Sequence, residues 1–360
     1  MSFFLGIDLG TSYFKAGIFD ETGKLHGLGR RPVEKNAYGR NVCELEVAVF
    51  RETLLFCIQD AIKEANTSPN EIYALSYSSQ ANSFILLDES DNPLTPLILW
   101  SDERAEDSSF PLQTFIKKTD FLYKTGLGIL PDKHSLIAKI DWFQKRQPYI
   151  WEKVRSIMSI SDYLTFILTG ERISDVSTSS MTGLLNVPES RWWQEAANIF
   201  NIEKKQLSTP LKVGSLIGNL NGKGAALIGL SSNAVMFSGG LDHHLAAIGA
   251  GLPRFNYISE SSGTVLACVN YRKEYKPQEG VNISRGLEEN HYFQMAFNTN
   301  GAIVLEWYRS NYAPGLSIPA LLALAEKVEP GCEGLLAKPS ANEYKGLKGF
   351  MAVKRGHTHA

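Results

Sequence analysis

Three ionisable side chains stand side by side in the segment SGGLDHHLAAIGAG: Asp242, His243 and His244. These residue types suit either a metal site or a proton acceptor. Two glycines precede the carboxylate, and the small residues after it are typical of a helix. Adjacent residues on a helix point about 100° apart, so two neighbouring histidines do not easily converge on one ion. The pattern therefore favours a lone carboxylate at a helix start, acting either as a helix cap or as a general base.

A second group of reactive residue types lies in the loop DLGTS and just after it. Gly10 permits a tight turn, while Thr11 and Ser12 offer hydroxyl and backbone donors that suit phosphate oxygens. Lys15 adds a positive charge, and Asp8 is suited to hold Mg²⁺ directly or through water. A plain hairpin with a Gly-Thr turn remains the alternative.

A loop of similar chemistry, SESSGT, runs from 259 to 264, with Glu260 near but not in register with Asp8. Two such loops in one chain favour a nucleotide clamped between two domains. Neither a Walker loop nor a GxGxxG after a strand occurs, so P-loop and Rossmann chemistry are poorly supported.

The elements around these loops are predicted from hydrophobic period and turn signals. The region 257–271, YISESSGTVLACVNY, repeats the β-turn-β pattern of the N-terminal segment. This favours two domains on the same plan, 1–245 and 246–360. Strands are expected at 3–10, 13–20, 25–32, 71–79 and 83–94, and helices within 44–66, 135–154 and 159–171.

Composition narrows the class of protein. A chain of 360 residues, 44% hydrophobic and 21% charged, is expected to form two globular domains. The net charge of −2 gives no reason to expect nucleic acid or an anionic membrane as a partner. Four widely spaced cysteines predict neither a zinc site nor a disulfide framework, and the N-terminus does not read as a signal peptide. A reducing cytoplasm is the expected location.

Five segments together resemble the FGGY family of carbohydrate kinases, with xylulokinase and gluconate kinase as the nearest relatives. They occur in the family's order and spacing: GIDLGTSYFKAGIFD, SSQANSFILLDESDNPLTPLILWSDERA, SDYLTFILTGERISDVSTSSMTGLLNV, SGGLDHHLAAIGAG and SESSGTV. The resemblance implies an α/β fold with two actin-like (ribonuclease H-like) domains around a cleft. It also implies transfer of the γ-phosphoryl of ATP, with Mg²⁺, to a hydroxyl of a sugar, polyol or sugar acid.

The resemblance also assigns roles to single residues. Asp242 becomes the general base, and Asp8 the metal ligand. The nucleotide side comprises Gly10, Thr11, Ser12 and Lys15 in the first loop, Ser262, Gly263 and Thr264 in the second, and Gly301 beside the nucleotide. The sugar pocket comprises Gln80, Asn82, Trp100, Asp102, Arg104 and Asp242.

Some features depart from the family or leave alternatives open. Ala81 and Asn82 stand where xylulokinases have Met and His, which leaves the sugar open. Asp102 and Arg104 could instead form a structural ion pair, and one of the two histidines could face the sugar. The expected partner is a small sugar, and a homodimer is left open.

The family's long helix and glycine-rich adenine loop would follow the last residues of this chain, so the second domain is expected to be incomplete. We expect the chain alone to bind ATP weakly and to turn over poorly. A sugar-binding pseudokinase or an inactive, shortened kinase chain is the alternative. A chaperone-type actin-like ATPase is disfavoured because it needs no sugar base.

Overall fold

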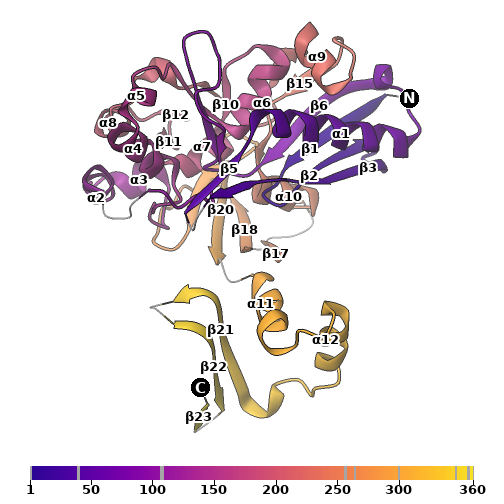
Figure 1. Ribbon diagram of the computed structural model, residues 1–360, viewed down its shortest axis with the longest axis vertical. Helices are drawn as coiled ribbons and strands as arrows, with labels where there is room; N and C mark the ends of the chain where they lie inside the picture. Colours follow the sequence, from indigo (N-terminus) through magenta and orange to yellow (C-terminus); the bar gives the residue numbers. More distant parts are fainter. Residues whose placement is uncertain are drawn as a thin grey trace. The chain divides into compact units, whose positions relative to one another are not determined.

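A seven-stranded sheet forms the centre of the larger part of the chain (Figure 1). The structure, a computed structural model, describes residues 2–38, 41–105, 109–254, 258–262, 265–298, 301–344, 347–354 and 357–359. The strand order is β14-β15-β6-β1-β2-β3, and β16 also pairs with β6. The strands are β1 (Phe3–Leu9), β2 (Tyr13–Phe19), β3 (Leu25–Pro32), β6 (Ile72–Ser79), β14 (Leu216–Asn219), β15 (Val235–Phe237) and β16 (Gly240–Leu241).

The sheet is mixed, since β1, β2 and β3 form an antiparallel meander while β6 runs parallel to β1, β15 and β16. In β1 every second residue is buried, which matches the period of two expected for a strand. Strands β2 and β3 pack beneath helix α1 (Val47–Ala65), whose inward positions include Phe50, Leu54 and Ile58.

Three helices contribute to one hydrophobic core with this sheet: α1, α6 (Ile160–Thr169) and α9 (Gly222–Ile228). Helix α6 begins at Ser159, whose hydroxyl accepts the amide N–H of Asp162, and ends at Gly170 in the left-handed region. The cap and stop residues thus fix the length of this helix in the sequence itself.

A second, five-stranded antiparallel sheet has the order β4-β5-β8-β7-β9. Its strands are β4 (Asn36–Tyr38), β5 (Val42–Leu45), β7 (Phe84–Leu87), β8 (Leu97–Ile98) and β9 (Ser156–Ser159). Two strand pairs, β10 (Ile173–Asp175) with β13 (Thr209–Leu211) and β11 (Leu185–Asn186) with β12 (Arg191–Trp192), complete this region. The remaining helices before residue 250 are α2 (Phe110–Ile116), α3 (Phe121–Thr125), α4 (Leu136–Arg146), α5 (Pro148–Trp151), α7 (Val176–Ser179), α8 (Gln194–Ile199) and α10 (Asp242–Gly249).

The chain separates into two units. The first comprises Met1–Gly249 and Tyr271–Gln294, and the second comprises Ala250–Asn270 and Met295–Ala360. A sheet of order β17-β18-β20-β19 is divided between them, with β17 (Ile258–Ser262), β18 (Leu266–Arg272), β19 (Asn282–Arg285) and β20 (Tyr292–Asn298). The second unit also holds α11 (Ile303–Tyr312), α12 (Ile318–Ala325) and a sheet of β21 (Leu335–Tyr344), β22 (Leu347–Lys354) and β23 (His357–His359).

Most of the predicted elements are found where the sequence placed them, but the strand expected at 83–94 is limited to β7, Phe84–Leu87. The strands expected at 3–10, 13–20 and 25–32 are β1, β2 and β3, and the helix expected within 44–66 is α1. The region 135–154 holds two helices, because α4 ends at Arg146 and Pro148 starts α5. No helix among the described residues is both long enough and apolar enough to cross a membrane.

Candidate active site

Three parallel strands end at the same edge of the central sheet. Strand β6 lies between β1 and β16 and runs parallel to both. The residues that follow the ends of β1, β6 and β16 are Gly10, Gln80 and Asp242. In open α/β sheets, ligands bind outside the carboxyl ends of the strands. The topology therefore gathers three predicted site residues from distant parts of the sequence at one edge.

A row of polar side chains crosses this end of the sheet. Asp8 lies opposite Lys15 in the antiparallel pairing of β1 and β2, and beside Ser78 in the parallel pairing with β6. Its Oδ2 lies 2.8 Å from Lys15 Nζ, and its Oδ1 accepts the Ser78 hydroxyl at 2.8 Å. The side chains of Asp8 and Lys15 remain 27% and 45% exposed. Both can therefore still meet a ligand, although each already has a protein partner.

The turn after β1 depends on a glycine. A Cβ on Gly10 would lie 2.7 Å from the carbonyl oxygen of Tyr13, which is too close for any other residue without a shift of the backbone. Ser12 is exposed at this turn. The predicted contact of its hydroxyl with phosphate stays a prediction.

Thr11 is held on the sugar side of the predicted site. Its hydroxyl accepts the indole Nε1–H of Trp100 at 2.7 Å and points to Gln80 Oε1 at 3.5 Å. Gln80 is 4% exposed, and its Nε2 donates to the carbonyl oxygen of Gly10 at 3.3 Å. The structure thus brings together the first loop and two residues predicted to contact sugar.

Asp242 is the first residue of helix α10, as the sequence indicated. Gly239, three residues earlier, is necessary because a Cβ there would lie 1.8 Å from the carbonyl oxygen of Tyr77 in β6. The Asp242 carboxylate accepts the amide N–H of His243 at 2.8 Å. The close approach of Gly239 to Tyr77 fixes the backbone just before Asp242.

Burial raises the pKa of Asp242, and the nearby Asp8 carboxylate raises it further, while His243 and Lys15 oppose the shift. A helix start by itself favours the ionised form of a carboxylate. Desolvation is instead the largest influence. A carboxylate with a raised pKa binds a proton more strongly, which is a useful property in a general base.

One of the two histidines beside Asp242, His244, lies in the protein core. His244 is fully buried, its Nδ1 lies 2.9 Å from the Ser177 hydroxyl, and its ring stacks on Phe293 with centroids 4.4 Å apart. Burial lowers the pKa of His244 to about 3, so its ring is neutral at physiological pH. Among the described residues, no group of three or more His, Cys, Asp or Glu side chains could hold a metal ion.

Asn82 has a structural task in the turn after β6. Its φ is 59°, in the left-handed region that Asn tolerates better than most residues. Its Oδ1 accepts the amide N–H of Leu136 at 3.0 Å, at the start of helix α4. The predicted contact of Asn82 with sugar would therefore have to come from its Nδ2 amino group.

Asp102 and Arg104 form the ion pair that the sequence left as an alternative. The Arg104 guanidinium donates to both oxygens of Asp102 at 2.8 Å, and also to Glu44 at 2.5 Å. Asp102 is fully buried and accepts the amide N–H of Cys43 at 2.7 Å as well. With its lone pairs occupied in this way, Asp102 holds the loop, and a contact of either residue with sugar stays a prediction.

The remaining predicted nucleotide residues lie in the second unit. Ser262 is the exposed last residue of β17, opposite Leu266 of β18, and Gly301 directly precedes the segment that leads into α11. Gly263 and Thr264 lie outside the described residues. The roles of these four residues stay predictions.

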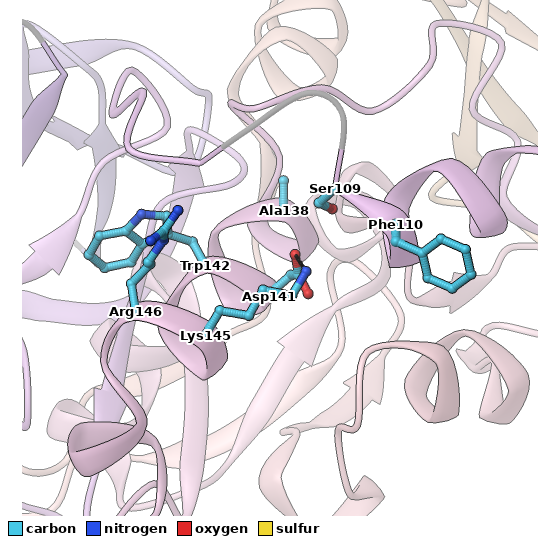
Figure 2. Close-up of a pocket in the computed structure, with 7 residues that line it drawn as sticks. All are labelled: Ser109, Phe110, Ala138, Asp141, Trp142, Lys145 and Arg146. Carbon is cyan, nitrogen blue, oxygen red and sulfur yellow. Dashed lines mark hydrogen bonds and ion pairs between the residues drawn. The ribbon is translucent and has the colours of Figure 1, made fainter.

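A separate pocket of about 300 Å³ lies on helix α4 and the start of α2 (Figure 2). Asp141 and Lys145 form an ion pair there at 2.7 Å, and the guanidinium of Arg104 lies over the ring of Trp142, 5.3 Å from its centroid. None of the predicted site residues lines it. The lining residues are Ser109, Phe110, Ala138, Asp141, Trp142, Lys145 and Arg146.

Three polar residues near the site were missed by the sequence reasoning. Ser78 lies beside Asp8, while Ser83 and Lys139 are both fully buried and bonded to the loop that carries Trp100. Lys139 had a visible signal, since it lies three residues after Leu136 and four before Phe143, on the buried face of α4. A cation on an apolar helical face is unusual and marks a specific partner.

Comparison with known proteins agrees with this arrangement. Residues 3–249 match the model of the FGGY family of carbohydrate kinases, N-terminal domain. The chain is 27% identical over 343 residues to xylulose kinase of Lactococcus lactis subsp. lactis (strain IL1403), covering 94% of this chain and 67% of that protein. It is also 27% identical over 356 residues to gluconokinase of Bacillus licheniformis, with the same two coverages.

The fold has close counterparts among solved structures. That of xylulose kinase from Rhodospirillum rubrum matches with a TM-score of 0.86 and 20% identity, covering 99% of this chain and 73% of the other. This likeness confirms the expected α/β fold class with its actin-like plan. The chain spans about two thirds of the length of the two relatives named above.

Proposed function

The chain belongs to the FGGY family of carbohydrate kinases, and we propose that it transfers the γ-phosphoryl of ATP to a hydroxyl of a ketose or sugar acid. The observation that carries this proposal is the position of Asp242. It follows β16 at the sheet edge where Gly10 and Gln80 follow β1 and β6, and burial raises its pKa. One carboxylate that binds a proton well is what the reaction needs at the acceptor hydroxyl.

In this proposal Asp242 accepts the proton of the sugar hydroxyl as that oxygen attacks the γ-phosphorus. The transition state of phosphoryl transfer is loose, so most of the catalysis comes from positioning and charge neutralisation. Lys15, which acts electrostatically on Asp242 and pairs with Asp8, supplies one of the positive charges.

The first loop is suited to phosphate and to a divalent cation. Ser12 is exposed, and Asp8 keeps part of its carboxylate open beside the Ser78 hydroxyl. Mg²⁺ is usually held by one or two carboxylates and several retained waters, which fits Asp8 with Asp242 nearby. When bound, the cation would neutralise phosphate charge. The second loop, with Ser262, Gly263 and Thr264, and the separate residue Gly301 before α11 are proposed to meet the rest of the nucleotide.

The sugar is proposed to lie against Trp100 and Gln80, with Asp242 at the reacting hydroxyl. Two similar relatives are named for xylulose and gluconate, which supports the predicted substrate class of a pentulose, a hexulose or gluconate. Because the Asn82 side chain accepts the amide N–H of Leu136 at the start of α4, we propose that Asn82 shapes the pocket more than it binds sugar directly. This proposal includes a sugar-binding domain, residues 1–245, and a nucleotide-binding domain, residues 246–360.

The test is a substrate panel with the 360-residue chain. Release of ADP from Mg·ATP is followed in the presence of D-xylulose, other ketoses and D-gluconate, and the product is identified by mass. We expect one compound to be phosphorylated in preference to the others. Sugar binding with no phosphorylated product from any compound would instead favour a non-catalytic binding protein or an inactive, shortened kinase chain.

A further inference from the structure

Every polar group of Trp100 is bonded to a different element. Its amide N–H donates to the Ser83 hydroxyl at 2.8 Å, and its carbonyl oxygen accepts from Lys139 Nζ at 2.9 Å. Its indole Nε1–H donates to the Thr11 hydroxyl at 2.7 Å. The turn after β6, helix α4 and the loop after β1 therefore each hold one group of this residue.

We propose that Ser83 and Lys139 are positioning residues, which fix Trp100 and, through it, the Thr11 hydroxyl of the first loop. The sugar face and the phosphate loop then form one rigid unit before any ligand binds. This inference rests on the proposed function in that Trp100 is taken to face the sugar.

Ser83 closes a ring of hydrogen bonds. Its hydroxyl accepts from the Trp100 amide and donates to Gln80 Oε1 at 3.0 Å. Thr11 closes the circuit, because its hydroxyl accepts from the Trp100 indole and reaches the same Gln80 oxygen. Ser83 is fully buried, so no water replaces its bonds. Four side chains from three segments thus fix one another's rotamers, which is how a binding site is organised in advance.

Lys139 has the burial and the partners of a dedicated clamp. It is fully buried, and its Nζ donates to two successive carbonyl oxygens, those of Leu99 at 2.8 Å and Trp100 at 2.9 Å. A buried amine is costly, and an apolar residue would fill this position of α4 more favourably. Its retention is explained if the chain needs those two carbonyls held in place.

The charge state of Lys139 does not break the clamp. Burial lowers the pKa of Lys139 to about 7, against the attraction of Asp102. A neutral amine still has two N–H donors, one for each carbonyl. We therefore expect the position of Trp100 to persist on both sides of neutral pH.

A direct test follows the indole N–H of Trp100 without any ligand. In protein labelled with ¹⁵N-tryptophan, Trp100→Phe identifies the signal of Trp100 among the six indoles. Lys139→Met keeps the length of the side chain but removes both donors. We expect the Trp100 indole N–H to exchange with solvent about tenfold faster or more in this variant.

Two controls make the result specific. Lys145→Met removes an amine two turns along the same helix, which pairs with Asp141 and not with the loop. The indole N–H of Trp192, which donates to Ser208 at 2.7 Å, serves as an internal reference. Neither control should change. Should Lys139→Met fail to fold, Ser83→Ala gives the same test, because it removes the acceptor of the Trp100 amide. Unchanged exchange of the Trp100 indole in a folded variant would overturn the proposal.

Kinetics supply a second readout. With the sugar found in the substrate panel, Lys139→Met should raise KM for that sugar about tenfold and lower kcat by much less. A merely structural defect would instead lower the active fraction, and so kcat, at unchanged KM, which would contradict a positioning role. If the native chain phosphorylates nothing, the proposed function fails, while the exchange experiment still decides whether Lys139 fixes Trp100.

Discussion

The chain contains two β-hairpins of similar design, and their settings differ. Strand β1 of the first hairpin pairs on both sides, with β2 and with β6. Among the described residues, β17 of the second hairpin lies at the end of its sheet and pairs with β18 alone. Every second residue of β1 is buried in the core, while Ile258 of β17 is 62% exposed. The same local pattern therefore occurs in two settings. The first strand of one hairpin is hydrogen-bonded along both edges, and in the described part of the chain the first strand of the other is hydrogen-bonded along one edge.

The cross-strand pairs near the two turns differ as well. Asp8 faces Lys15 across the first hairpin and forms an ion pair at 2.8 Å. Glu260 faces Cys268 across the second, with the thiol sulfur 3.9 Å from Glu260 Oε2. Only the first pair brings a carboxylate and an amine together at the end of a central strand. We infer that the first loop carries the charge chemistry and the second contributes mainly hydroxyl and backbone donors.

Exchanging each carboxylate for its amide should show the largest difference between the hairpins. Asp8→Asn is expected to lower kcat/KM for ATP by roughly 10²–10³-fold, because the carboxylate proposed to hold Mg²⁺ beside the phosphates is lost. Glu260→Gln should change it by less than about threefold, since Glu260 is a partly exposed group without a cationic partner across its hairpin. ADP release at varied Mg·ATP measures both. Equal effects would remove the distinction between the two loops.

Truncating an apolar side chain in each hairpin should lower the free energy of unfolding by different amounts. Leu5→Ala in β1, where Leu5 is 2% exposed, is expected to lower the free energy of unfolding by about 2–4 kcal/mol. Ile258→Ala in β17 should change it by no more than about 0.5 kcal/mol, because its side chain is mostly in water. Urea denaturation of the two variants provides the measurement. A large loss from the Ile258 variant would mean that β17 is covered in solution.

Buried carboxylates should give the first unit a pH dependence of its own. Burial raises the pKa of Asp162 to about 7 and that of Asp175 to about 6, from a usual value of 3.8. Between the usual and raised values the folded state binds more protons than the unfolded state, so stability falls as pH rises.

The variant Asp162→Asn isolates this effect, because an amide imitates the protonated acid. Relative to the native chain, it should gain roughly 1–3 kcal/mol of unfolding free energy at pH 8. The gain should shrink as pH falls through about 7 and vanish near pH 4, where both side chains are uncharged. Urea unfolding at several pH values would show this. A difference that does not depend on pH would contradict the assigned burial effect.

Local signals in the sequence were sufficient for most elements of the first unit. The alternation in β1, the Gly170 stop of α6 and the glycines before Asp242 each act through neighbouring residues. These local patterns predict the same helix or strand in any fold that buries the same face of the element. The five ordered motifs added the family and, with it, the α/β actin-like plan.

What the sequence could not provide were partners from distant segments. Thr11 was read as a phosphate donor from its loop alone, and the bond of its hydroxyl to Trp100, 89 residues away, was not foreseen. The Asp102–Arg104 ion pair was stated as an alternative, but the amide N–H of Cys43, 59 residues from Asp102, was not foreseen as a further donor to this carboxylate. A residue type states which bonds a side chain can form. The fold alone decides which partner takes them.

The pKa of Asp242 is a further case. The helix start visible in the sequence favours the ionised form, while burial of the carboxylate favours the protonated one. Burial is the larger influence. Because desolvation depends on the whole packing around a group, no reading of neighbouring residues would have ranked the two effects.

The most direct test of the account is Asp242→Asn, compared with the control Asp60→Asn. Asp60 lies on helix α1 and forms an ion pair with Arg31 of β3. Phosphorylation of the preferred sugar and binding of the same sugar by calorimetry are measured for both. The account predicts that Asp242→Asn loses about 10²–10⁴-fold in turnover while binding sugar nearly as tightly as the native chain, and that Asp60→Asn changes neither. Turnover within about threefold of native in a folded Asp242→Asn protein would contradict the role of Asp242 as the general base.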